Sequence, residues 1–235
     1  MKRETMKPAT GLVLLLMLAG STVRAEIKVT ALKGRVYVRH NVQEQWVPVA
    51  RGDVLKPEDS MKSDEKSSST LLVDGKTTVV LPEMAIIDLS DLRSLTREDL
   101  LLKLAMERIR SVPGSGSGDE LNMPRTTIIH GPNVGQRHVT ADTDPEIGAM
   151  QMKGTEVLFG NGFYETGVLK AKGLFRIHPE LAKRTDDRLM VAKALEKLTL
   201  KGEALEEYVD LRAGPLTDQQ RAFVSQKIGE LKGMR

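Results

Sequence analysis

Four side chains near the middle of the chain are of types that bind metals. His130 and His138 lie eight residues apart, and Asp142 and Asp144 follow them. A zinc site needs three or four convergent ligands and a tighter pairing, such as two histidines four residues apart on one helix. We therefore interpret these histidines as surface loop residues and predict no metal site.

A second candidate is the acidic pair Asp186 and Asp187, which is flanked by Arg184 and Arg188. Adjacent residues on a helix point about 100° apart, so the two carboxylates do not converge on one substrate atom. A solvated helix face explains this cluster better than a catalytic pair of carboxylates.

Nucleophiles and phosphate loops are not indicated either. The Ser-Ser-Ser-Thr run at 67–70 has no nearby base, and no Gly-x-Ser-x-Gly elbow occurs, so we interpret the run as a polar turn. The Gly-Ser-Gly-Ser-Gly run at 114–118 lacks the Gly-Lys-Ser/Thr of a phosphate loop. The absence of cysteine excludes thiol chemistry and disulfides. We predict that the protein is not an enzyme and binds no cofactor.

The start of the chain is typical of a signal peptide. Basic residues Lys2, Arg3 and Lys7 precede an apolar run at 11–20, and we predict cleavage after Ala25. The apolar run is shorter than the ~20 residues that span a bilayer. We expect a periplasmic or secreted protein that meets the membrane only through this transient segment.

Removal of the signal peptide changes the charge. The whole chain carries 35 basic and 32 acidic residues, and residues 1–25 contain four basic residues and one acidic residue. The mature chain therefore has 31 of each and a net charge of zero. The pI near 9.0 belongs largely to the signal peptide, so we predict no binding to nucleic acid.

Residues 26–95 have the pattern of an all-β domain. Short runs of β-branched and aliphatic residues recur every ~8–12 residues with turn residues between them, which favours a β-sandwich or β-roll. Val36 and Val38 alternate with Tyr37 and Arg39, as in a half-buried strand. The Asp-Gly pair at 74–75 suits a type I′ hairpin turn, because both central positions need positive φ.

The same segment resembles the FecR-type domain of bacterial envelope proteins. The resemblance covers about a quarter of the chain. It is carried by Gly34, Val36, Val38, Trp46, Gly52, Asp53, Leu55, Leu72, Asp74, Gly75, Leu81 and Pro82. It implies an exported binding module in envelope sensing or signal relay, with an envelope protein as partner. In regulators of extracytoplasmic sigma factors, a cytoplasmic domain and a membrane helix precede the FecR-type domain. We expect this chain to lack both, so we favour a scaffold or sensor.

We expect Trp46 to anchor the core.

From residue 96 onward, the spacing of the apolar residues changes from that of strands to that of helices. Residues 96–112 are predicted to form an amphipathic helix with Thr96 as N-cap and an apolar stripe of Leu101, Leu104, Ala105 and Ile109. Residues 113–122 are typical of a Gly/Ser linker. We expect a short strand and loop at 123–143, in which 124–131 resembles a second FecR-type element.

Residues 144–235 are predicted to be helical. The turn at Gly162, the small Gly167 and the terminating Pro179 resemble a tetratricopeptide repeat. A partial second copy places Ala204 37 residues after Gly167, near the ~34-residue period of such repeats. Thr217 is expected to cap a last helix. An ordinary α-helical bundle explains the same pattern about as well, so both alternatives stay open.

The expected fold is α+β in two parts, an N-terminal β-domain followed by a helical domain. Stacked helices often bind partners on a concave face. The candidate partner-binding residues are Tyr164, Lys170, Arg184, Arg188 and Tyr208. Both tyrosines are alternatively core positions. The leading function is a non-catalytic scaffold, and the alternatives are a cell-wall or polysaccharide-binding module and an assembly adaptor for surface structures.

Overall fold

The computed structural model describes residues 26–41, 43, 45–111 and 144–233. The predicted signal peptide, the linker at 113–122, the strand and loop at 123–143, and His130, His138 and Asp142 lie outside these residues. Within the described part of the chain, no helix is both long and apolar enough to span a membrane.

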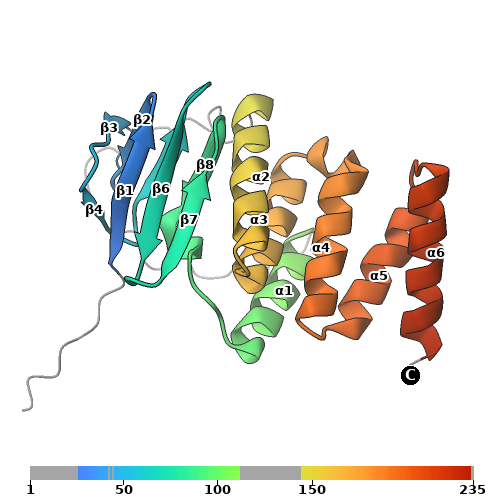
Figure 1. Cartoon of the computed structure of the whole chain (residues 1–235). Helices are drawn as coiled ribbons and strands as arrows, with labels where there is room; N and C mark the ends of the chain where they lie inside the picture. The colour runs from blue at the N-terminus through green and yellow to red at the C-terminus, as the bar shows by residue number, and fades with distance from the viewer. Residues whose placement is uncertain (1–25, 42, 44, 112–143, 234–235) are drawn as a thin grey trace, which may run out of the picture.

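The N-terminal part consists of two four-stranded antiparallel sheets (Figure 1). Sheet A has the order β4-β1-β6-β7, with β1 Ile27–Lys33, β4 Val54–Leu55, β6 Ser68–Val73 and β7 Thr77–Leu81. Sheet B has the order β3-β2-β5-β8, with β2 Val36–Arg39, β3 Val47–Pro48, β5 Ser60–Ser63 and β8 Ala85–Asp88. Aliphatic residues of both sheets form one core, which confirms the predicted all-β arrangement of this part.

Alternation along the strands follows the prediction. Val36 and Val38 are each 3% exposed and face the core, so Tyr37 and Arg39 lie on the outer face of sheet B. The hairpin between β6 and β7 also forms where expected. Asp74 and Gly75 have φ of 52° and 64°, as a type I′ turn requires.

The predicted polar turn at 67–70 is wrong, because β6 begins at Ser68. Ser67 and Ser69 are 3% and 2% exposed, and the preceding polar stretch contains β5, an inner strand of sheet B. Most buried hydroxyls are hydrogen-bonded, and those of Ser67 and Ser63 are, whereas Ser69 Oγ has no hydrogen-bond partner among the described residues. Ser67 Oγ accepts a hydrogen bond from the Arg35 amide at 2.9 Å, and Ser63 Oγ accepts one from the Ala85 amide at 3.2 Å.

Trp46 does not anchor the core, contrary to the prediction. It is half-buried beside the outer face of sheet B, where the Arg39 guanidinium lies 5.0 Å from its ring centroid. The core is filled by aliphatic residues and Met61 instead.

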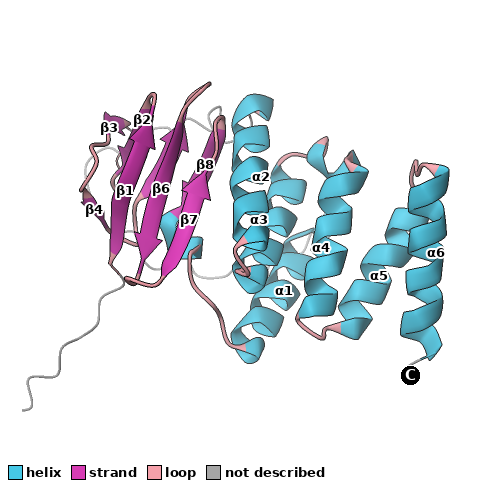
Figure 2. Ribbon diagram, in the orientation of Figure 1, coloured by secondary structure: helices cyan, strands magenta, loops and turns pink. Residues whose placement is uncertain are grey.

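The C-terminal part is helical, as predicted, so the molecule is an α+β protein (Figure 2). Its helices are α1 Arg97–Ser111, α2 Pro145–Gly160, α3 Tyr164–Ile177, α4 Thr185–Lys197, α5 Lys201–Arg212 and α6 Asp218–Gly233. Consecutive helices from α2 to α6 pack on one another, and α1 packs on α3. Single 3-10 turns occur at Leu89–Asp91 and Leu181–Lys183.

Several predicted helix signals act as expected. The Asp99 amide donates to Thr96 Oγ1 at 3.1 Å, so Thr96 caps α1. Thr217 and Gln220 exchange hydrogen bonds of 3.0 and 3.2 Å at the start of α6, which is a capping box. Gly162 turns the chain between α2 and α3 with φ of 84°.

Helix α2 joins the two parts. β7 and β8 are the last strands of sheets A and B, and α2 packs against both (Figure 1). A Cβ atom on Gly154 would lie 1.9 Å from the Ile86 carbonyl oxygen, and Leu158 belongs to the core between the sheets. The helix therefore covers two strand edges that could otherwise pair with other chains.

Candidate functional site

Of the five predicted partner-binding residues, the two tyrosines pack inward. Tyr208 is 0% exposed in the helical core, and its hydroxyl donates to Glu196 Oε1 at 2.5 Å. Its assignment as a partner contact is therefore wrong, because no partner reaches a fully buried ring. Tyr164 is half-buried against the same core.

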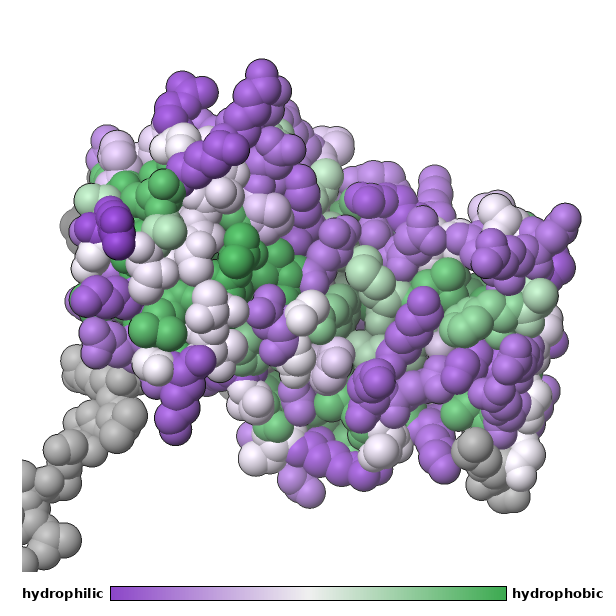
Figure 3. Space-filling view, in the orientation of Figure 1, coloured by the Kyte–Doolittle hydropathy of each residue, from purple (hydrophilic) through white to green (hydrophobic). Residues whose placement is uncertain are grey.

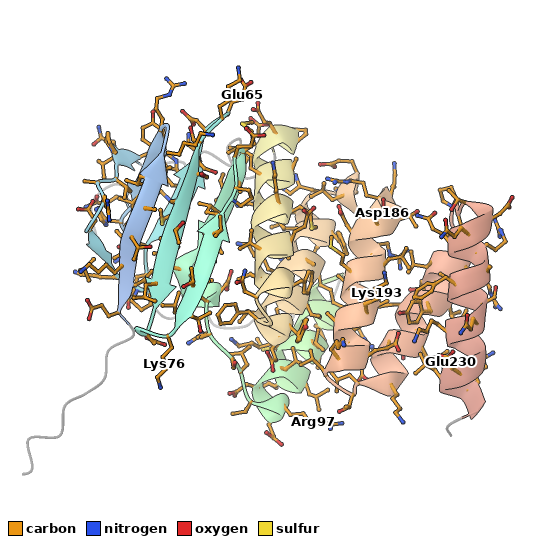
Figure 4. The ribbon with its side chains drawn as sticks, in the orientation of Figure 1. Glu65, Lys76, Arg97, Asp186, Lys193 and Glu230 are labelled. Carbon is orange, nitrogen blue, oxygen red and sulfur yellow. The ribbon has the colours of Figure 1, made fainter. Side chains whose placement is uncertain are left out.

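Arg184 and Arg188 are engaged within the molecule. Arg184 Nε lies 3.1 Å from Asp187 Oδ2, and Arg188 lies 3.4 Å from Glu207. Asp186 is exposed near α6 (Figure 4), but Asp187 is 2% exposed, so a solvated face does not describe it. Burial raises the pKa of Asp187, although the nearby Arg184 charge opposes this shift.

Lys170 is the predicted residue that lies in a cleft. An open cleft of about 410 Å³ lies where sheet B and the following 3-10 turn meet α1 and α3. It is lined by Asp88, Asp91, Arg93, Leu95, Lys103, Met106, Glu107, Thr166, Leu169 and Lys170. Acidic, basic and apolar groups are all present, which suits a charged segment of a partner better than a purely apolar ligand.

Asp88, the last residue of β8, is held in its ionised form. Lys170 Nζ donates to Asp88 Oδ2 at 2.5 Å, and Ser60 Oγ donates to Asp88 Oδ1 at 2.6 Å. Burial alone raises the pKa of Asp88. The Lys170 charge, both hydrogen bonds and the charge of Arg39 outweigh burial and hold the pKa below its usual range.

Asp91 lies three residues later, at the end of the 3-10 turn, and behaves in the opposite way. Burial raises the pKa of the Asp91 carboxyl to about 6, with Asp88 adding to the shift and Lys170 opposing it. The backbone on this turn is tied to α3, because Thr166 Oγ1 donates to the Asp91 carbonyl oxygen at 2.7 Å.

Two carboxyls with separated pKa values are a pattern found in acid–base catalysis. Here Asp88 is neutralised by Lys170, so it is not free to act as a base or nucleophile. Among the residues that the structure describes, no group of three or more His, Cys, Asp or Glu side chains is placed to hold a metal. The cleft can exchange one proton at Asp91 and bind a charged group.

Helix α1 separates this cleft from a second hollow and is apolar on its solvent side. Leu100 is 1% exposed and packs in the helical core, whereas Leu102, Met106 and Ile109 are 63%, 45% and 74% exposed. Leu102 and Ile109 lie about 200° and 180° around the helix from Leu100, because each residue turns it by about 100°.

The apolar residues predicted to form one stripe on α1 are not buried. Leu101, Leu104, Ala105 and Ile109 line an open groove of about 480 Å³ together with Arg108 and Glu203 of α5. Only Leu104 of the four is partly buried against the helical core. Leu100, which is not part of the predicted stripe, is the buried residue that anchors the helix.

Exposed apolar residues also occur on sheet A. Val54 and Val80 are 59% and 53% exposed, and Figure 3 shows hydrophobic residues over the face that sheet A presents. They lie on β4 and β7, the two opposite end strands of sheet A, whereas Leu102, Met106 and Ile109 of α1 lie within eight residues of one helix. Scattered exposed hydrophobics need no explanation, but a cluster does.

Sequence reasoning missed both features of this region. Asp88 and Asp91 were overlooked because nothing local marks carboxyls that a distant Lys170 approaches. Leu102 and Met106 carried a usable signal, because the leucines at 100, 101, 102 and 104 and Met106 spread over about 240° of the helix, which is more than one buried stripe covers. Comparisons with family models, with curated proteins and with solved structures find no match to this chain.

Proposed function

We propose that the protein is a non-catalytic, exported binding or scaffold protein that takes part in envelope sensing or signal relay by contact with another envelope protein. The observation that carries the proposal is the solvent side of α1, where Leu102, Met106 and Ile109 are exposed together. Clusters of this kind mark surfaces that a partner covers. We call this surface the α1 face.

The surroundings of the α1 face also suit a protein partner. The apolar groove lies on one side of the helix and the mixed-charge cleft on the other, with Lys103 and Glu107 on the cleft side. An apolar centre with a charged rim is the usual composition of a protein–protein interface.

The placement in the envelope rests on sequence features. The predicted signal peptide and the resemblance of the β segment to a FecR-type domain support export and envelope signalling. The helix pairs support the tetratricopeptide-like alternative: Gly167, where a Cβ would lie 2.7 Å from the Phe159 ring, and buried Ala204 both allow close helix contact. Repeats of this kind act by binding other proteins.

The test is photo-crosslinking in the native cell from a photoreactive residue at position 102 or 109. We expect one recurrent envelope protein to be captured at both positions, and Ile109→Glu to weaken its purified complex about tenfold or more, since the partner would desolvate a charge.

Val80→Glu is the matched control, because it places the same charge at an exposed valine on sheet A. Thermal unfolding of both variants checks the fold. Equal loss of the complex in Val80→Glu and Ile109→Glu, or capture that does not depend on the crosslinker position, would contradict a role for the α1 face.

A further inference from the structure

A second surface lies on the outer face of sheet B and contains no residue of α1. Tyr37 and Arg39 of β2, Trp46 just before β3, and Lys62 of β5 gather there. The Arg39 guanidinium lies 5.0 Å from the Trp46 ring centroid, and the Lys62 ammonium lies 5.5 Å from Trp46 and 5.3 Å from Tyr37. We call these four residues the Trp46 platform.

Arg39 has an unused binding capacity. Its Nε is buried and donates to no acceptor, and the guanidinium forms no salt bridge with any residue that the structure describes. The cation–π contact keeps the Arg39 guanidinium at the Trp46 ring, and its planar fork can bind a carboxylate with two hydrogen bonds.

The local charge leaves room for an anion. Arg35 and Lys62 share the Asp64 carboxylate at 3.4 and 3.9 Å, so one carboxylate serves two cations there. The Asp88 carboxylate, on the same face, is already paired with a helix lysine. One positive charge of the Arg35 and Lys62 pair therefore remains for a ligand. Arg39 adds to it, because its charge acts on Asp88 without forming a salt bridge to it.

We propose that the Trp46 platform binds a carboxylate-bearing saccharide. The half-buried Trp46 and Tyr37 rings offer apolar surface on which the C–H groups of a sugar ring can pack. Arg39 and Lys62 bind the sugar carboxylate from the same side. The terminal Nη groups of Arg39, rather than its buried Nε, donate to this carboxylate.

A saccharide fits this face better than a peptide strand. One edge strand of sheet B, β3, has two residues, and its Pro48 has no amide hydrogen to donate. The other edge, β8, is covered by α2. Because both edges are closed, a peptide gains no backbone hydrogen bonds by extending the sheet.

The platform does not share residues with the α1 face, so this inference stands independently of the proposed partner. Its test uses the purified mature chain and the fluorescence of Trp46, which is the only tryptophan of the protein. The probe is tetragalacturonate. We expect a saturable change in the intensity or wavelength of Trp46 emission, weakened by added salt.

Arg39→Gln and Lys62→Gln should each weaken tetragalacturonate binding about tenfold, because each removes a charge-assisted hydrogen bond. Arg39→Lys keeps the charge, but a lysine cannot form the bidentate hydrogen bonds of a guanidinium to one carboxylate. This variant should therefore also lose affinity for tetragalacturonate. Lys76→Gln removes a cation from the β6–β7 turn, outside the platform (Figure 4), and should leave binding unchanged. Thermal unfolding confirms that each variant is folded.

Two further ligands separate the chemistry. The same tetramer with its carboxyls reduced to alcohols should bind at least tenfold more weakly. Hexaglutamate, which has charge but no sugar ring, should change the emission of Trp46 little. No saturable change with tetragalacturonate, equal binding of hexaglutamate, or equal loss in Lys76→Gln would overturn the proposal.

Discussion

At the scale of single residues, two aspartates three positions apart have opposite acidities. Asp88 ends a strand and meets Ser60 on a neighbouring strand and Lys170 on a helix, which keeps it charged. Asp91 sits in the same cleft, where burial outweighs the nearby cations and raises its pKa to about 6. The two aspartates therefore differ in pKa because different residues from distant parts of the chain surround them.

The raised pKa of Asp91 makes stability depend on pH. Its pKa is near 3.8 in the unfolded chain and about 6 in the folded one, so the folded state binds more protons between these values. Stability should fall as pH rises through this window. We expect Asp91→Asn to remove that fall and to stabilise the protein at pH 7 by about 1–2 kcal/mol, since the site is half-buried.

Urea unfolding at pH 4, 5, 6 and 7 measures this difference. Glu65→Gln, at an exposed turn position (Figure 4), is the control and should follow the wild type. If the free energy of unfolding depended on pH in the same way for the wild type and for Asp91→Asn, the raised pKa of Asp91 would be refuted.

At the scale of elements, a partly exposed polar network at the edge of the helical core ties α4, α5 and α6 together. Tyr208 of α5 donates to Glu196 of α4, and Lys227 of α6 lies 3.0 Å from the other oxygen of Glu196. Burial and the hydrogen bond to Glu196 raise the pKa of Tyr208, so its hydroxyl remains a donor at physiological pH. Each helix contributes one member.

Tyr208→Phe should lower the free energy of unfolding by about 1–2 kcal/mol, because it removes a hydrogen bond to a charged acceptor and leaves the ring packing intact. Tyr164→Phe is the matched control and should change stability by less than about 0.5 kcal/mol. Chemical denaturation of both variants is the measurement. Equal effects would show that the hydroxyl of Tyr208 contributes nothing specific.

At the scale of the whole molecule, α2 determines how the two parts meet. Gly154 lets the helix backbone approach the Ile86 carbonyl, and Leu158 completes the core between the sheets. The packing of α2 on β8 and on the core between the sheets thus joins the helical part to the sheets.

Gly154→Ala should destabilise the protein by about 3 kcal/mol, because the added methyl group meets a backbone oxygen that cannot move aside cheaply. Gly173→Ala in α3 is the opposite case: its Cβ would meet nothing within 4 Å, so it should stabilise the helix by about 0.5–1 kcal/mol. Thermal unfolding compares the two. A neutral Gly154→Ala would mean that α2 can retreat from β8.

Much of the fold was predictable because the signals are local. The Asp-Gly turn at 74–75, the alternation of β2, the Thr96 and Thr217 caps and the succession of helices follow from backbone geometry and hydrogen bonds within a few residues. The sequence by itself therefore determined most element types, the α+β class and the position of Lys170 on a helix, but not the strand that begins at Ser68.

Only the tertiary structure decided which faces are covered. The buried serines at 67 and 69, the half-exposed Trp46 and the exposed Leu102 all depend on what packs against them from distant parts of the chain. Residues Asp88 and Lys170 are 82 positions apart, so no local pattern could pair them. Burial and charge pairing are properties of the whole packed chain, and both candidate surfaces are defined by them.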